Sequence, residues 1–317
     1  MKVLVTGATG FVGSALMSAL VTEPHIEARG AARSGSEQDR ATAPIYGVGN
    51  IDAKTNWQPC LEGVDAVVHL AARAHVLQES CKDPLSVFRE VNVQGTINLA
   101  KQCIEAGVKR FVFVSSIGVN GNTTERPFTE FCEPKPHADY AISKFEAEQQ
   151  LTALLENASM ELVIVRPPLV YDAAAPGNFR RLLAFVSKGL PLPFGMLENK
   201  RSMVSRTNLV DILKLCLTHP AAANEVFLAG DGEDFSTSEI VTLLAKGMGK
   251  SATLIPVPLF VLRTASTLLG RRGMYVQLCE SLQVDSSKIR QLLGWKPKTN
   301  AQTQLIKAGR EYLDSRR

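Results

Sequence analysis

The sequence predicts an α/β protein: a Rossmann doubly wound parallel sheet with a smaller, mostly helical C-terminal domain. Three observations support this fold class. The apolar run 2–6 is followed by glycines at positions 7, 10 and 13. Strand-like and helix-like segments then alternate through the first half, which is typical of a parallel sheet with helices on both faces. Finally, small or polar residues follow several of these strands at their carboxyl ends, where open parallel sheets bind ligands.

The opening segment "MKVLVTGATGFVG" predicts a strand at 2–6, a tight turn, and a helix from Phe11 to Leu20. In such a turn Gly7 permits the bend, Gly10 permits close approach of a pyrophosphate, and Gly13 permits close packing of the helix on the strand. The pyrophosphate would lie at the positive end of the helix. The predicted cofactor-binding residues of this segment are Gly7, Gly10, Phe11, Val12 and Gly13.

The later elements follow from the same patterns, and their composition changes after Pro167, where proline, glycine and polar residues become frequent. We expect further strands at 26–32, 65–72, 109–116, 161–168 and 225–230, and helices at 91–107, 140–157, 179–187 and 208–218. The predicted domain division assigns 1–167 plus 204–230 to a dinucleotide-binding domain, and 168–203 plus 231–317 to a substrate domain.

Composition limits the possible classes of protein. With 45% hydrophobic and 21% charged residues and a net charge of +4, the chain fits a globular enzyme, and no basic block indicates nucleic-acid binding. The six cysteines form no C-x-x-C pair, so we expect reduced thiols, a cytoplasmic location and no metal site. The apolar segment 253–270 is interrupted by Arg263 and two prolines, so no membrane span is predicted. We expect a buried or interfacial helix there, packed within the substrate domain rather than against a membrane.

The candidate catalytic residues are Ser116, Tyr140 and Lys144. Tyr140 and Lys144 are four residues apart and therefore lie on one face of the predicted helix. A nearby ammonium and the positive ring of an oxidised nicotinamide both favour the phenolate, so we expect a lowered pKa for Tyr140. Such a tyrosine can take a proton from a sugar hydroxyl or return one to a ketone. Ser116, at the end of its strand, would hydrogen-bond the same oxygen.

Arg33 bears on the choice of cofactor. Rossmann domains that bind NAD place an acidic residue about 20 positions beyond the glycines, where it binds the ribose hydroxyls. Here that position holds Arg33, which suits a 2′-phosphate and favours NADP. The alternative is that Arg33 stacks on adenine and that NAD is bound.

With these motifs the chain resembles the extended short-chain dehydrogenase/reductase family. Within that family it resembles the NAD-dependent epimerases and dehydratases that act on nucleotide sugars. The resemblance extends over essentially the whole chain. The matching stretches are "TGATGFVG" (6–13), "HLAA" (69–72), "NVQGT" (92–96), "FVFVSSIGVNG" (111–121), "YAISK" (140–144), "RPPLVY" (166–171), "GNFRRLLAFVSKGLPLPFG" (177–195) and "NKRSMV" (199–204).

The resemblance implies roles for further residues. Asn92 would support the catalytic site, and Leu70, Ala71 and Ala72 would lie along the cofactor. Pro167 would lie beside the nicotinamide, and Asn50 and Ile51 would line the adenine. Asn178, Phe194 and Arg201 would hold the nucleotide diphosphate, with Phe194 against the uracil. A homodimer is usual among relatives, and residues 87–104 and 144–155 would form its interface.

The resemblance leaves the exact reaction open. Ile117 and Gly118 replace the acidic pair of the dehydratases, which disfavours dehydration. The favoured reading is a reductase of UDP-4-keto-sugars, acting at C4 in surface-polysaccharide precursor synthesis. The alternative is a UDP-glucose or UDP-N-acetylglucosamine 4-epimerase with bound NAD. A non-enzymatic NADP-binding regulator and a dehydrogenase for lipids or sterols are more remote readings.

Overall fold

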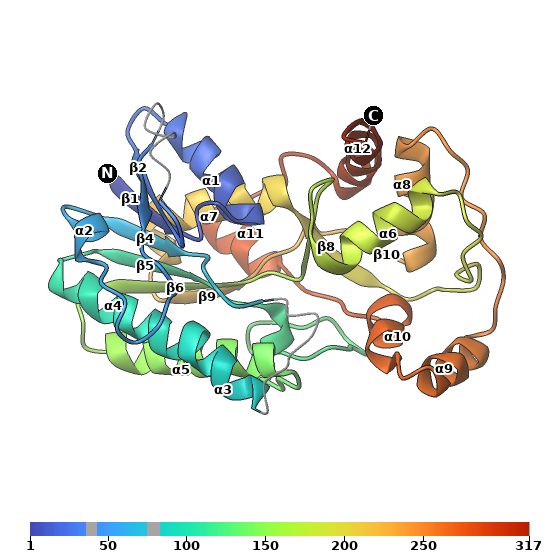
Figure 1. Cartoon of the computed structure of the whole chain (residues 1–317), viewed down its shortest axis with the longest axis horizontal. Helices are drawn as coiled ribbons and strands as arrows, with labels where there is room; N and C mark the ends of the chain where they lie inside the picture. Colours follow the sequence, from blue (N-terminus) through green and yellow to red (C-terminus); the bar gives the residue numbers. More distant parts are fainter. Residues whose placement is uncertain (36–42, 75–82, 317) are drawn as a thin grey trace.

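The computed structural model describes residues 1–35, 43–74 and 83–316, and its larger sheet has seven strands (Figure 1). All neighbouring strands run parallel, in the order β3-β2-β1-β4-β5-β6-β9. The order reverses between β1 and β4, which is the switch point where doubly wound sheets bind ligands. The strands are β1 (Lys2–Thr6), β2 (Glu27–Ala32), β3 (Ile45–Gly47), β4 (Ala66–His69), β5 (Arg110–Val114), β6 (Glu161–Arg166) and β9 (Glu225–Leu228).

Helices cover both faces of this sheet because alternate apolar residues of each strand point to opposite sides. Val112 of β5 packs with Leu16 and Leu213 on one face, whereas Phe111 packs with Leu99 and Leu151 on the other. Figure 1 shows the two helical layers. The first contains α1 (Phe11–Val21), α7 (Arg206–Thr218) and α11 (Ser287–Leu293), and the second contains α2 (Gln58–Leu61), α3 (Pro84–Arg89), α4 (Thr96–Glu105) and α5 (Asp139–Leu155).

The first turn requires its glycines. Gly7 has a φ of +68°, and a Cβ there would lie 2.9 Å from the backbone nitrogen of Ala71. At Gly13, a Cβ would lie 2.1 Å from the carbonyl oxygen of Gly7, so helix α1 could not pack this closely on the turn. The predicted roles of Gly7 in the bend and Gly13 in packing therefore have a direct structural reason.

A second, three-stranded sheet and most of the later helices form the C-terminal part. Its apolar core includes Phe179, Leu244 and Leu305 from three helices. The elements here are β7 (Leu169–Tyr171), β8 (Arg201–Ser205), β10 (Asp234–Phe235), α6 (Gly177–Ser187), α8 (Thr237–Gly247), α9 (Leu259–Leu268), α10 (Arg272–Cys279) and α12 (Ala301–Asp314).

The predicted fold class is confirmed, and three local features differ from the sequence reading. The helix expected at 91–107 begins as a π-helix, η2 (Glu90–Gly95), and continues as α4. Helix α11 packs in the core of the large sheet, although the predicted division assigns it to the substrate domain. No residue of α9 is buried, so of the buried or interfacial helix expected within 253–270 the buried form is not found, and Leu262 of this helix packs on the C-terminal core.

Among the residues that the structure describes, no helix combines the length and apolar character needed to cross a bilayer. The five cysteines among these residues are free thiols, and Cys81 lies outside the described residues.

Candidate active site

The carboxyl ends of β1 and β4 meet beside the glycine turn. The hydroxyl oxygen of Thr6 accepts a hydrogen bond from the backbone N–H of Ala71 at 3.3 Å. Helix α1 starts at this point with no side-chain cap and no acidic residue in its first turn. Its first backbone N–H groups are therefore available to an anion. Leu70, Ala71 and Ala72 are half-buried along the same edge.

The predicted catalytic residues come together at the ends of β5 and α5. Ser116 caps the 3₁₀ turn η3 (Ile117–Val119), and its hydroxyl accepts a hydrogen bond from Gly118 N–H at 3.1 Å. A Cβ on Gly118 would lie 3.3 Å from Ser116 Oγ and 3.2 Å from Ala141 Cβ. Ser116 and the first turn of α5 thus flank the same glycine, and Tyr140 directly precedes Ala141.

Lys144 is buried on the inner face of α5. Its ammonium lies 3.9 Å from the centre of the Phe113 ring, in a cation–π contact. Burial lowers the pKa of Lys144 to about 7, and the negative charge of Glu148 opposes this shift. An amine with such a pKa changes its charge near neutral pH.

Tyr140 is half-buried and its ring packs edge-on against Phe88, with the ring centres 6.3 Å apart. Burial raises the pKa of Tyr140 to about 12. The lowered pKa expected from Lys144 is therefore not found among the groups of the protein itself. Loss of hydration disfavours the phenolate here. The expectation also relied on the charge of the nicotinamide ring, which belongs to the cofactor.

A buried ion pair anchors α5, which carries the candidate residues Tyr140 and Lys144, and sequence reasoning missed it. Arg166, at the end of β6, donates from Nε to Glu148 at 2.9 Å and from Nη2 to the other carboxylate oxygen at 2.5 Å. Its Nη1 donates to Asn120 Oδ1 at 3.0 Å. Glu148 follows Lys144 by one helical turn, so an available signal was an acidic residue on the apolar face of α5.

His69, at the end of β4, connects the glycine turn to the start of α4. The Thr96 hydroxyl donates to the carbonyl oxygen of Asn92 at 2.7 Å, so it must accept from His69 Nε2 at 2.9 Å. His69 Nδ1 then accepts from the Thr6 hydroxyl at 2.7 Å. Burial, with a smaller effect of Lys144, lowers the pKa of His69 to about 3, which keeps the ring neutral.

Asn92 lies within the π-helix η2, a geometry that often occurs at functional sites. Its side chain accepts from Arg73 N–H at 2.8 Å and donates to the Arg73 carbonyl oxygen at 3.0 Å. It also donates to the Ser143 hydroxyl at 3.0 Å, which in turn donates to the Tyr140 carbonyl oxygen at 2.8 Å. Asn92 therefore links the segment after β4 to the first turn of α5.

The remaining predicted cofactor residues lie along the same edge of the sheet. Arg33 is exposed just beyond β2, and its carbonyl oxygen accepts from Gly49 N–H at 3.1 Å. Asn50 is exposed, and Ile51 packs against Gly95 so closely that a Cβ there would lie 2.5 Å from Ile51 Cγ2. Pro167 is buried beyond β6, where its carbonyl oxygen accepts from Ile117 N–H at 3.0 Å.

The three predicted substrate residues have different environments. Arg201 is partly buried and lines a cavity of about 40 Å³, and its guanidinium donates to the Glu280 carbonyl oxygen at 3.1 Å. Burial lowers the pKa of Arg201 to about 10. Asn178 is exposed and donates to Gln277, which lines the same cavity. Phe194 is buried in the C-terminal core, so the structure does not present its ring on an open surface for stacking.

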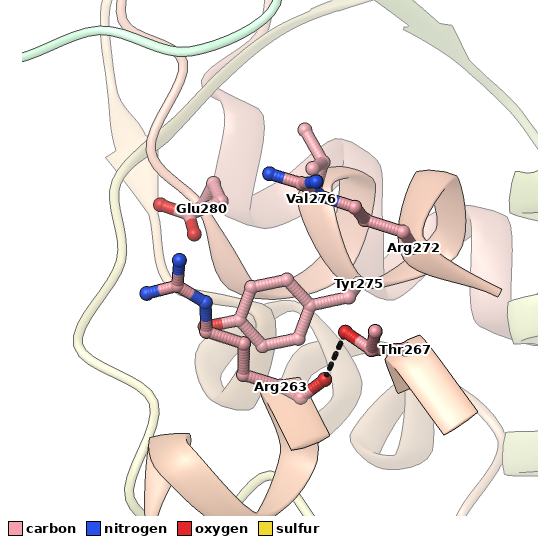
Figure 2. Close-up of a pocket in the computed structure, with 6 residues that line it drawn as sticks. All are labelled: Arg263, Thr267, Arg272, Tyr275, Val276 and Glu280. Carbon is pink, nitrogen blue, oxygen red and sulfur yellow. Dashed lines mark hydrogen bonds between the residues drawn. The ribbon is translucent and has the colours of Figure 1, made fainter. Parts of the chain in front are cut away.

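A larger cavity, of about 350 Å³, lies between α9 and α10 (Figure 2). None of its lining residues is a predicted site residue. Figure 2 shows the Tyr275 ring beside Arg263, whose carbonyl oxygen accepts from the Thr267 hydroxyl at 3.0 Å. The lining residues are Arg263, Thr267, Arg272, Tyr275, Val276 and Glu280.

Residues 3–230 match the model of the NAD dependent epimerase/dehydratase family. A UDP-glucose 4-epimerase of Vibrio cholerae is 43% identical over 317 residues, which cover 99% of this chain and 96% of the relative. An N-acetyl-alpha-D-glucosaminyl-diphospho-ditrans,octacis-undecaprenol 4-epimerase of Escherichia coli O157:H7 is 30% identical, with 91% of this chain and 88% of the relative covered. The solved UDP-glucuronic acid 4-epimerase of Bacillus cereus, in complex with UDP-glucuronic acid and NAD, has a TM-score of 0.81 at 24% identity, with all of both chains covered.

Proposed function

The chain belongs to the NAD dependent epimerase/dehydratase family, and on that premise we propose that it is a UDP-hexose 4-epimerase that retains NAD. A reductase and an epimerase would both use the same serine, tyrosine and lysine, so these side chains do not distinguish the two hypotheses. The observation that carries the choice is the 43% identity to a UDP-glucose 4-epimerase over almost the whole of both chains. It favours the alternative over the reductase that the sequence alone suggested.

The residues at the switch point fit a dinucleotide. A Cβ at Gly7 or Gly13 would collide with backbone, and the uncapped start of α1 offers N–H groups to a pyrophosphate. The comparisons give no support to the preference for NADP, whereas NAD is named in the complex of the Bacillus cereus epimerase. In this proposal the exposed Arg33 stacks on adenine. When bound, NAD supplies a reversible acceptor for the hydride from C4 of the sugar.

The chain's own groups handle the proton and orient the sugar. Tyr140 takes the proton of the sugar 4-hydroxyl and later returns it to the C4 oxygen. Ser116 donates a hydrogen bond to that oxygen as its negative charge develops. Lys144, when charged, stabilises the Tyr140 phenolate, and Asn92 holds the first turn of α5 in place through Ser143. Arg201 would bind the diphosphate, with Asn178 beside it.

The test is to measure cofactor content and activity together. Freshly purified protein is denatured, and the released cofactor is identified by chromatography. The intact protein is incubated with UDP-glucose without added cofactor, and UDP-galactose is measured. We expect stoichiometric NAD and epimerisation. Protein without bound NAD that consumes NADPH with a UDP-4-keto-sugar would instead establish the reductase.

A lipid-linked sugar is the second candidate substrate. The relative from Escherichia coli O157:H7 is named for a sugar carried on undecaprenyl diphosphate. Such a substrate presents an N-acetylated hexose and a diphosphate to Tyr140 and Arg201, without the uridine. Assays with polyprenyl diphospho-N-acetylglucosamine in detergent, run beside UDP-glucose, measure the preference directly. Turnover of the lipid-linked sugar with none of UDP-glucose would replace the first substrate by the second.

We also propose a homodimer formed through α4 and α5. The two helices lie side by side on one face of the molecule (Figure 1), and Ile104 is exposed at the end of α4. Light scattering coupled to size-exclusion chromatography measures the mass of the particle. Ile104→Asp is expected to shift a dimer towards monomer, and an unchanged mass would remove this interface.

A further inference from the structure

Helix α9 exposes large apolar side chains at the edge of the C-terminal part. Figure 1 shows it at the periphery, beside α10 and away from the seven-stranded sheet. The exposed fractions are 71% for Phe260 and 82% for Leu268, and Leu269, directly after the helix, is 71% exposed. Contiguous exposed apolar surface of this kind marks an interaction site more often than scattered single residues do.

Three of the exposed side chains, Phe260, Val261 and Leu268, share one face of the helix, whereas Leu269 lies on the side of Leu262. At 100° per residue, Phe260, Val261 and Leu268 lie within about 100° of one another. The opposite face carries Leu262, which packs on the C-terminal core. The helix is thus apolar on its outer side as well as on its inner side, and no residue of it is buried.

The charged residues of the segment that contains this face are all basic. Residues 251–279 contain Arg263, Arg271 and Arg272 and no aspartate or glutamate. All three arginines are exposed. The next acidic residue along the chain is Glu280, which lines the cavity between α9 and α10 together with Arg263 and Arg272 (Figure 2), so three arginines outnumber one carboxylate here. An apolar face bordered by arginines is complementary to a surface that is both anionic and apolar, which is the boundary of an anionic lipid bilayer.

We propose that α9 is a membrane-surface element, which binds anionic bilayers with Phe260, Val261 and Leu268 inserted at the level of the acyl chains. Arg263, Arg271 and Arg272 then contact lipid phosphates. The helix has ten residues, so it lies in the interface and does not span it. A second protein copy would cover the apolar residues equally well, but a border with a net positive charge repels an identical border, whereas lipid phosphates attract it.

The experiment measures binding of the purified full chain to sedimented vesicles. One vesicle type contains equal parts of phosphatidylcholine and phosphatidylglycerol, and the other contains phosphatidylcholine alone. We expect binding to the anionic vesicles that weakens as salt concentration rises. The double variant Phe260→Ser/Leu268→Ser should bind about tenfold or more weakly, because two exposed apolar side chains lose their burial in lipid. Arg271→Gln/Arg272→Gln should weaken binding to the anionic vesicles.

Matched control variants lie elsewhere on the surface. Phe131→Ser changes a phenylalanine that is 90% exposed, and Arg126→Gln changes an exposed arginine. Both should bind vesicles like the wild type. An unchanged melting temperature shows that the α9 variants fold. Since sedimentation needs no turnover, the result is independent of the proposed epimerase activity.

Two results would overturn the proposal. One is wild-type protein that stays in the supernatant with anionic vesicles. The other is wild-type protein that self-associates, by light scattering, with Phe260→Ser/Leu268→Ser abolishing that association and leaving vesicle binding unaltered. The second result would assign the apolar face to another copy of this chain.

Discussion

Helices α5 and α9 show how differently the two parts of the molecule hold their charged groups. In α5, Lys144 and Glu148 are buried, and each has a defined partner: the Phe113 ring for one and Arg166 for the other. In α9, every side chain is at least partly exposed. Buried polar groups require fixed partners. In the large-sheet part, the pattern Y-x-x-x-K therefore predicts where the side chains of α5 lie.

The same contrast holds for the predicted site residues. Those of the large sheet lie at the carboxyl ends of its strands or on the elements that follow them. Those of the C-terminal part are separated: Asn178 is exposed, Phe194 is in the core, and Arg201 lines a small cavity. Topology brings strand ends together, whereas no comparable rule positions the side chains of loops and short helices. The four changes below test this contrast.

Tyr140→Phe should have the largest effect. It removes the proton-transferring hydroxyl and should lower kcat by about 10²- to 10⁴-fold while leaving NAD content intact. Steady-state epimerisation of UDP-glucose measures the loss. Tyr312→Phe is the matched control, since the Tyr312 hydroxyl is buried in the C-terminal core without a hydrogen-bond partner in the described structure. Retention of more than about a tenth of the activity by Tyr140→Phe would contradict the assigned role.

Glu148→Gln should destabilise the fold. It leaves the Arg166 guanidinium buried without its counter-charge, which costs about 3–5 kcal/mol. Urea denaturation measures the free energy of unfolding. Glu311→Gln breaks an exposed i,i+4 pair with Lys307 and should cost at most about 1 kcal/mol. Equal effects of the two changes would show that the buried pair is no stronger an anchor than a surface pair.

Arg201→Ala tests the C-terminal half of the site. Loss of a partly buried charged contact should weaken UDP binding by about 30-fold to several thousand-fold, corresponding to about 2–5 kcal/mol. Arg201→Lys should have a smaller effect, because lysine keeps the charge but loses the planar fork. Titration calorimetry with UDP measures both, and Lys200→Ala, at an exposed neighbour, is the control. Unaltered UDP affinity in Arg201→Ala would remove Arg201 from the substrate site.

Lys144 should make the stability of the ligand-free protein depend on pH. Its pKa is about 7 in the folded state and about 10.4 in the unfolded chain, so between these values the unfolded state binds more protons. The free energy of unfolding should therefore rise with pH in that window, by up to about 1.4 kcal/mol per pH unit from this group. Lys144→Met should lack this component in denaturation experiments at pH 7.5 and 9.5. Identical slopes for both proteins would refute the lowered pKa.

The sequence alone predicted the fold class, which the structure confirms, and it predicted a candidate site at one edge of the large sheet. Three glycines between a strand and a helix allow a close turn, and a spacing of four residues puts Tyr140 and Lys144 on one face. The alternation of strands and helices then places Ser116 at the same edge, because parallel strands end on one side. These inferences rest on local geometry, which a sequence pattern encodes directly.

The remaining features depend on contacts between segments that are distant in the sequence. The pairing of Arg166 with Glu148, and the hydrogen bonds that join His69 to Thr6 and Thr96, depend on strand register and helix packing between distant segments. The pKa of Tyr140 depends on burial, which exceeded the effect expected from Lys144. The exposure of α9 also could not be predicted, because an apolar segment has the same sequence pattern whether other elements cover it or not. Burial depends on how distant elements pack against one another, and a local sequence pattern does not specify that packing.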